Sequence, residues 1–241
     1  MSPNYNSLND LVASFSTSEF IVTIGTPRDD IEELKELIAS SFATNPVRKE
    51  LGITKELLKD EVQGVAEKAL NERISILIRE RKSGKLASFM INEDFATQFK
   101  SNKKSPIPEE KRRCVDAITN VDSKAIQILG FEPENLSKGD LFFVHLGGTQ
   151  NGFEGFGLST LTVVASIELG KRLGYKHFVS TSTNIVSYRI LLKLGFHSVV
   201  RKNFLEFEFP PGSNQFPLKE IPSKGASKEA HVLIQSFVSR L

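Results

Sequence analysis

The sequence predicts an α/β protein, because short β-branched runs alternate with longer segments of helical spacing. The clearest strand is the apolar run at 141–146, which leads through a glycine-rich loop into an amphipathic helix that begins near residue 158. Hydrophobic residues make up 39% of the 241 positions and charged residues 25%. That balance is typical of a folded domain and not of a disordered chain.

The other elements follow from local patterns. Residues 1–18 are polar and predict a loosely held N-terminal arm, with residues 19–241 forming a single domain. Further strands are predicted at 20–24, 74–78, 85–91, 177–181, 196–200 and 204–209. Helices are predicted at 31–42, 54–71, 109–129, 158–173, 184–193 and 227–240.

Charge and cysteine content exclude several classes of function. Lys plus Arg total 31 and Asp plus Glu total 29, so a net charge of +2 gives no reason to expect a nucleic-acid or membrane partner. The single cysteine, Cys114, excludes a disulfide framework, and the four histidines lack metal-ligand spacing, so no metal is expected. Neither a secretory leader nor an 18-residue apolar run is visible, which predicts a cytoplasmic protein.

The loop Gly152-Phe153-Glu154-Gly155-Phe156-Gly157, followed by Leu158, has the arrangement of a phosphate-binding turn. The first N–H groups of a helix lack internal partners, and glycine lets a phosphate approach them closely. The loop has no lysine, which excludes a Walker loop, and its glycine order is not that of a Rossmann fingerprint. A tight strand-to-helix turn without a ligand stays open as the alternative.

Two motifs after this loop make a wider match. The block 141–200 contains Gly155-x-Gly157-Leu158, then Asn184-Ile-Val-Ser187, then Lys193-Leu-Gly-Phe196. It resembles the GNAT superfamily of N-acetyltransferases, whose phosphate loop reads R/Q-x-x-G-x-G/A and whose next helix reads N-x-x-A/S and ends in K-L-G-F. Two shorter segments, 42–47 and 181–187, are similar to the arylalkylamine-type acetyltransferases of insects. The resemblance implies a mixed, mostly antiparallel sheet that is flanked by helices and splays apart at its central strands, at Gly147.

The resemblance also implies acetyl coenzyme A as co-substrate. The residues that it would place against the coenzyme are Leu146, Gly147, Gly148, Gly152, Phe153, Glu154, Gly155, Phe156, Gly157, Leu158, Asn184 and Lys193. Three positions depart from the family pattern. Gly152 stands where the family has Arg or Gln, Asn45 where it has a glutamate base, and Leu191 where it has a tyrosine acid.

Acetyl transfer to an amine requires a base, a site for the developing oxyanion and help for the departing thiolate. His145, near the end of its strand, is the first candidate for the base, because imidazole exchanges protons near neutral pH. A core histidine satisfied by hydrogen bonds is the alternative. Ser187 and Tyr188 lie one helical turn before Leu191 and are the candidate proton donors, although Tyr188 could equally be a packing residue.

Three further assignments complete the predicted site. Ser182 could orient the amine or a water, and the side chains of Asn45, Phe42 and Phe143 are the candidates for contacting the acceptor. The sequence thus predicts an acetyl-CoA-dependent N-acetyltransferase that acts on a small primary amine by direct transfer in a ternary complex. A different acyl chain, an amino-acid or protein acceptor, and a non-catalytic acyl-CoA-binding module stay open, as does the choice between monomer and homodimer.

Overall fold

The computed structural model describes residues 5–97, 105–222 and 226–237. These residues form one mixed sheet in the order β1-β2-β3-β4-β5-β7-β6. The strands are β1 Phe20–Ile24, β2 Ile76–Glu80, β3 Leu86–Asp94, β4 Leu141–Thr149, β5 His177–Ser182, β6 His197–Asn203 and β7 Glu229–Ser236. The pairing of β4 with β5 is parallel and every other pairing is antiparallel, which confirms the predicted fold class.

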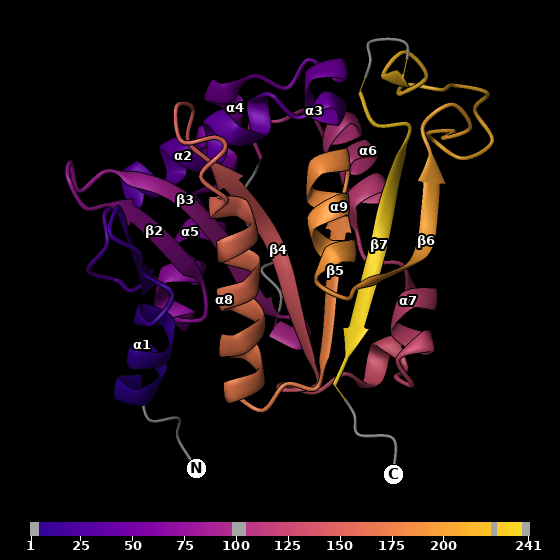
Figure 1. The fold of residues 1–241 in the computed structure, drawn as a ribbon. Helices are drawn as coiled ribbons and strands as arrows, with labels where there is room; N and C mark the ends of the chain where they lie inside the picture. The colour runs from indigo at the N-terminus through magenta and orange to yellow at the C-terminus, as the bar shows by residue number, and fades with distance from the viewer. Residues whose placement is uncertain (1–4, 98–104, 223–225, 238–241) are drawn as a thin grey trace.

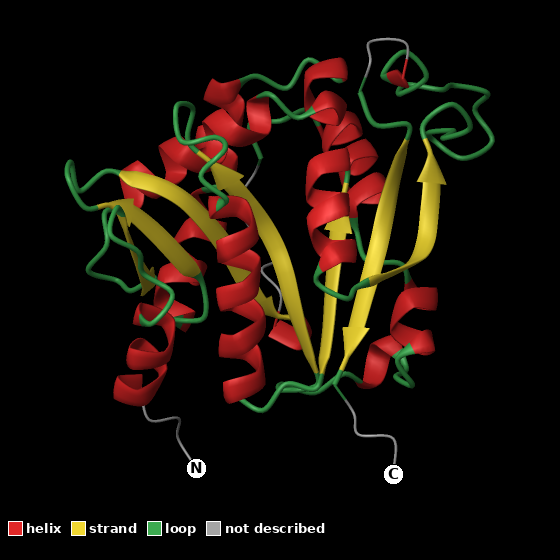
Figure 2. Ribbon diagram, viewed as in Figure 1, coloured by secondary structure: helices red, strands yellow, loops and turns green. Residues whose placement is uncertain are grey.

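Helices cover both faces of the sheet (Figures 1 and 2). They are α1 Tyr5–Ala13, α2 Ile31–Ala43, α3 Pro46–Glu50, α4 Lys55–Glu61, α5 Gln63–Glu72, α6 Glu109–Thr119, α7 Ser123–Ile128, α8 Leu158–Arg172 and α9 Ile185–Lys193. Short 3-10 turns lie at Phe95–Thr97 and Pro133–Asn135. On one face α1, α8 and α9 share an apolar core with the sheet, while α2 and α5 pack on the opposite face. No helix in the described ranges is long and apolar enough to cross a bilayer.

The two central strands separate partway along their length. The parallel pairing runs from Leu141↔His177 to Val144↔Ser180 and then stops, so β4 and β5 diverge from His145 onward. Figure 1 shows the resulting V, which opens toward the ends where α8 and α9 begin. The predicted splay is therefore confirmed, although it starts before Gly147.

A β-bulge at His145 shapes the arm of the V that β4 forms. Ile91 pairs with Leu146 and Asn92 with Val144, so His145 is the extra residue on β4. A bulge leaves its extra residue unpaired and re-aims the side chain. As a result His145 and Leu146 both face the α2–α5 side, where Leu146 packs against that core.

The N-terminal prediction requires a correction. Residues 5–13 form helix α1 rather than a loose polar arm, and Leu8 and Val12 are 2% and 0% exposed. Both side chains belong to the core that α8 and the sheet share. Leu8 and Val12 are four residues apart and so lie on one face of a helix. The overall polar composition of the segment does not reveal this spacing.

The C-terminal prediction is wrong in a different way. Residues 204–209 are not a strand, and residues 229–236 form β7, where a helix was predicted. β7 lies between β5 and β6, and its residues Ala230, Val232, Leu233 and Ile234 are buried. Pairing on both edges and burial on both faces override local helix preference. The last residues of the predicted helix, 238–240, lie outside the described residues.

Two long predicted helices are each divided in two. The predicted helix 54–71 breaks at Val62, which caps α4 and precedes α5. The predicted helix 109–129 breaks at Asn120, whose backbone is extended, and restarts after Asp122, which caps α7 with its side chain. Each break turns the chain so that both halves can bury their apolar sides against the sheet or its neighbours.

Candidate active site

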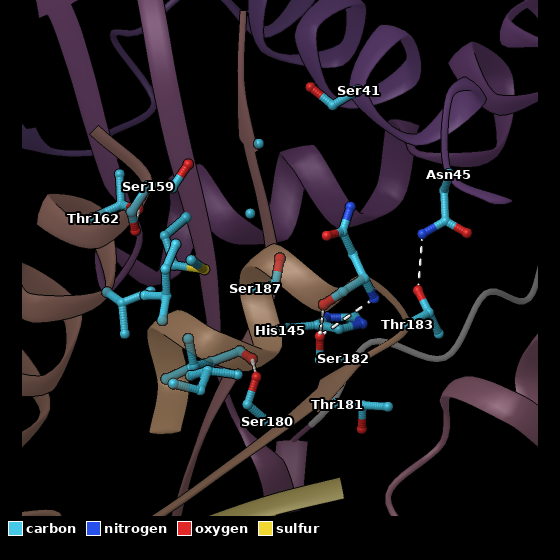
Figure 3. A pocket seen from close by; sticks show the side chains of 18 of the residues that line it. Ser41, Asn45, His145, Ser159, Thr162, Ser180, Thr181, Ser182, Thr183 and Ser187 are labelled. Atoms are coloured by element: carbon cyan, nitrogen blue, oxygen red, sulfur yellow. Dashed lines mark hydrogen bonds between the residues drawn. The ribbon is translucent and has the colours of Figure 1, made fainter. Parts of the chain in front are cut away.

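A pocket of about 160 Å³ occupies the opening between β4 and β5. Its lining comes from the end of α2 and the start of α3, from β3 and β4, from α8, and from the end of β5 with α9. Figure 3 shows Ser41 and Asn45 projecting from the α2–α3 side, residues 180–183 from the β5 side, and His145 between them. Segments far apart in the sequence thus converge where the sheet opens.

The pocket has two walls, one on each face of the sheet, because successive side chains of a strand point to opposite faces. Ser180 and Ser182 face the side of α8 and α9, while Thr181 and Thr183 face the opposite side, which they share with His145. Met90 and Gly147 line the α8 side, and Asn45 lines the other side. A coenzyme arm and an acceptor could therefore enter from opposite faces of the sheet and meet in the opening.

His145 lines the pocket and is backed by a buried acid. Its Nδ1 lies 2.8 Å from Oε2 of Glu93, whose side chain is 1% exposed. The other carboxylate oxygen of Glu93 accepts a hydrogen bond from Lys68 Nζ at 3.1 Å, and Lys68 also pairs with Glu72 at 2.9 Å. A carboxylate oxygen repels a ring lone pair, so the hydrogen of a neutral imidazole sits on Nδ1 and the Nε2 lone pair is available to a ligand.

Phe143 supports the imidazole from behind. Its ring stacks on that of His145, with a centroid distance of 4.4 Å and an interplanar angle of 21°. Phe143 is 2% exposed, contacts Phe95 edge to face, and does not line the pocket. The structure therefore does not bring Phe143, a predicted acceptor contact, to the pocket, and its ring packs against the imidazole of His145 instead.

Asn45 and Phe42 do line the pocket, as predicted for acceptor contacts. The Asn45 side chain caps α3 by accepting from Val47 N at 3.0 Å, and its amide donates to Thr183 Oγ1 at 2.8 Å. The guanidinium of Arg48 lies 4.7 Å from the centroid of the Phe42 ring. Burial lowers the pKa of Arg48 to about 10, so it stays charged at neutral pH and fixes the ring by a cation–π contact.

The candidates on β5 and α9 have different surroundings. Ser187 lines the pocket from the first turn of α9. Ser182 also lines it, but its hydroxyl donates to the Asn184 carbonyl at 2.8 Å and so closes the strand-to-helix turn. Tyr188 faces away from the pocket and stacks on His231 at 3.9 Å, so the structure does not bring its hydroxyl to the site. Leu191 is buried and lines the pocket as an apolar side chain.

Gly147 and Gly148 line the pocket at positions where an added Cβ would require neighbouring side chains to move. A Cβ on Gly147 would lie 2.5 Å from Met90 Cε, and one on Gly148 would lie 2.5 Å from Ser41 Oγ. Beyond Val144, the edge of β4 that faces β5 has no strand partner, so its backbone groups are open to a ligand. Ser180 donates to the Val144 carbonyl at 2.8 Å and closes the narrow end of the V.

The glycine loop leads into α8, and one of its amides, Phe153 N, donates to the Gln150 carbonyl at 3.1 Å. Gly152, Gly155 and Gly157 have φ values of 92°, 85° and 75°, in the left-handed region that favours glycine. Gly157 is the N-cap of α8, and no side chain caps the first turn. The Glu154 carboxylate accepts a hydrogen bond from Gly152 N at 2.6 Å. One loop amide is therefore already held by an internal anion.

The other predicted coenzyme contacts divide into two groups. Phe153 and Phe156 pack edge to face on Phe20 of β1, at 6.0 and 5.4 Å, and anchor the loop to the sheet. Leu158 is buried in the core. Asn184 lines the pocket while capping α9 through Val186 N at 2.7 Å. Lys193 is exposed in the last turn of α9, at the opposite end from Asn184, and the structure does not bring it to the pocket.

Sequence reasoning missed Glu93, the hydroxyl of Ser41 on α2, and the hydroxyls of residues 180, 181 and 183 on the β5 side. Asn92, Glu93 and Asp94 are all buried in β3, although three consecutive polar residues are typical of a loop. The described residues contain no group of three His, Cys, Asp or Glu side chains that could hold a metal ion. The chemistry available in the pocket is therefore that of one imidazole–carboxylate pair, several hydroxyls and open backbone.

Comparison with known proteins adds the fold family. No family model matches the sequence, and no curated protein sequence matches it. The structure is similar to the C-terminal condensation domain of Ebony bound to β-alanyl-dopamine, with a TM-score of 0.70 and 13% identity over 90% of this chain and 99% of that one. Arylalkylamine N-acetyltransferase 2 of Aedes aegypti gives a TM-score of 0.62 and 16% identity over 91% and 99% of the two chains. An agmatine N-acetyltransferase gives a TM-score of 0.62 and 12% identity over 91% of this chain and 100% of that one. The chain has the fold of the GNAT acetyltransferases.

Proposed function

We propose that this GNAT-fold chain is an acetyl-CoA-dependent N-acetyltransferase that transfers the acetyl group directly to a small primary amine in a ternary complex. The observation that carries the proposal is the pocket in the V of β4 and β5, with His145 on one wall and the uncapped first turn of α8 at its mouth. The coenzyme fits the open glycine loop because exposed N-terminal amides and the helix dipole bind phosphate.

His145 acts as the general base. Bound acetyl-CoA supplies a thioester carbon that the amine attacks, so an N–C bond forms and the C–S bond breaks. Nε2 of His145 takes a proton from the amine and later releases it to solvent, while Glu93 stabilises the imidazolium. Glu93 acts through His145 and is a positioning residue.

Backbone and hydroxyl groups stabilise two negative charges, one that develops on the thioester carbonyl oxygen and one on the departing sulfur. The open edge of β4 at 146–148 offers N–H groups to the carbonyl oxygen as it gains negative charge. Ser187, on the α9 wall, donates a hydrogen bond to the departing thiolate, which takes its proton from solvent. This arrangement needs neither the tyrosine that the family resemblance implies at Leu191 nor a hydroxyl from Tyr188.

Calorimetry with acetyl-CoA and a thiol-release assay over an amine panel test the proposal together. We expect binding in the micromolar range and acceptor-dependent thiol release that falls at least 100-fold in His145→Ala. Absence of acetyl-CoA binding at millimolar ligand would refute the proposal. A His145→Ala variant with an unchanged pH–rate profile would remove the base assignment.

A non-catalytic acyl-CoA-binding module is the second candidate function, and Leu191 favours it. Leu191 lines the pocket with an apolar side chain at the position where the family resemblance implies a proton-donating tyrosine. Protein that binds acetyl-CoA but releases no thiol with any amine would support this candidate. The buried thiol of Cys114, whose pKa burial raises to about 11, is compatible with the cytoplasmic location that we propose with either function.

A further inference from the structure

The acceptor half of the pocket is rich in hydrogen-bonding side chains. Its wall on the His145 side consists of Ser41, Phe42, Thr44, Asn45, Thr181 and Thr183. Among the described residues that line the pocket, His145 is the one ionisable side chain, and no carboxylate, lysine or arginine joins it. This composition restricts which acceptors the pocket can hold.

Two of these hydroxyls have no hydrogen-bond partner although their oxygens are buried. They are Ser41 Oγ and Thr181 Oγ1, which come from opposite sides of the opening. The neighbouring Ser40 hydroxyl, by contrast, donates to the Glu36 carbonyl at 2.8 Å. A buried hydroxyl without a partner is unfavourable, and within a binding pocket a ligand is the natural partner.

A third hydroxyl is only partly used. Thr183 Oγ1 accepts a hydrogen bond from Asn45 Nδ2, so its own hydrogen is left for another acceptor atom. Ser41, Thr181 and Thr183 thus line the pocket with hydroxyls that have unused hydrogen-bonding capacity. A ligand that satisfies them must carry several polar groups besides the reacting amine.

Charge and shape exclude the other amine classes. A polyamine would place its second ammonium in a pocket whose described lining has no carboxylate, and an amino acid would place its carboxylate where no lysine or arginine reaches it. An arylalkylamine would find one aromatic wall, Phe42. We propose that the acceptor is a primary amine with an uncharged, hydroxylated body, of the amino-alcohol or amino-sugar class. This inference rests on the proposed acetyl transfer and deepens it.

Matched pairs of amines test the inference in the full-length protein. Thiol release is measured with 2-amino-1,3-propanediol against 3-aminopentane and with glucosamine against cyclohexylamine, all at equal free-base concentration. Putrescine, β-alanine and 2-phenylethylamine complete the panel. The same amines are run with Ser41→Ala, Thr181→Val and the matched control Ser40→Ala. Calorimetry with acetyl-CoA on each variant reports coenzyme binding separately.

We expect kcat/KM at least tenfold higher for the hydroxylated member of each pair, because a site built around hydroxyl contacts rejects an analogue that lacks them. Ser41→Ala and Thr181→Val should each reduce that preference at least threefold without changing acetyl-CoA affinity, and Ser40→Ala should retain it. Two results would overturn the acceptor assignment while leaving acetyl transfer intact. One is a higher kcat/KM for any amine of the panel that is not hydroxylated, and the other is an unchanged preference for the hydroxylated amines in both pocket variants. No thiol release with any amine would overturn both.

Discussion

Replacing Glu93 by glutamine is the most direct test of the imidazole–carboxylate pair. The substitution preserves side-chain volume and removes one charge 2.8 Å from His145 Nδ1. Lys68 keeps its ion pair with Glu72 at 2.9 Å, so the change does not leave a buried ammonium without a partner. We therefore expect Glu93→Gln to fold and to bind acetyl-CoA as the wild type does.

The magnitude follows from the charges. Two unit charges about 4 Å apart interact with about 4 kcal/mol at an effective dielectric constant of about 20. Lys68 lies 3.1 Å from the other oxygen of Glu93 and offsets part of that energy, which leaves about 2 kcal/mol for stabilising the imidazolium. Since about 1.4 kcal/mol corresponds to a factor of ten, kcat should fall about 30-fold.

The assay is thiol release at saturating acetyl-CoA and amine, which reports kcat. Glu72→Gln is the matched control, since it removes a carboxylate from the same lysine without touching His145. In a His145→Ala background Glu93→Gln should cost nothing further. A kcat within threefold of wild type would refute the reasoning.

Three other outcomes follow from the structure. Glu154→Gln removes the negative charge beside the loop amides, so calorimetry should show acetyl-CoA binding about fivefold tighter at low salt, and equal or weaker binding would contradict the proposed loop contact. Leu8→Ala should lower the free energy of unfolding by about 3 kcal/mol in urea melts, and a loss under 0.5 kcal/mol would place α1 outside the core. Burial lowers the pKa of His231, so the unfolded chain binds its proton first and stability should decrease as pH falls below about 6.5, by at most about 1.4 kcal/mol per pH unit. His231→Gln should flatten that slope and the exposed His197→Gln should retain it.

Local sequence patterns predicted the elements that local chemistry determines. The β4 strand, the glycine loop and α8 follow from an apolar run, positive-φ glycines and a helical period, and the structure has all three. β7 could not be predicted in this way, because Ala-His-Val-Leu-Ile suits a helix or a strand equally. Its pairing with β5 and β6 decides the outcome, and both strands precede it by more than 25 residues.

In the candidate site, too, local sequence predicts some residues, and others are brought in only by strand pairing. The end of a strand beside a glycine loop was sufficient to single out His145. Glu93 is 52 positions earlier and reaches His145 because β3 pairs with β4 and both side chains lie on the face of the sheet that α5 covers. The register between two strands leaves no mark in the sequence of either one, so the partner of the proposed base is visible only in three dimensions.

The substitution of Asn45 for the glutamate that the family resemblance implies has a structural consequence beyond the loss of a base. An amide can donate as well as accept, and Asn45 uses both capacities, toward Val47 N and toward Thr183 Oγ1. Asn45 thereby links the start of α3 to the end of β5 across the acceptor wall. A carboxylate at this position could only accept a hydrogen bond, so it would need the Thr183 hydroxyl to be the donor. Because Asn45 holds the two walls together, the proposed acetyl transfer needs another pocket residue to take the proton. Among the pocket residues that the structure describes, His145 is the one with a basic side chain, so the replacement of the glutamate is consistent with the proposed role of His145.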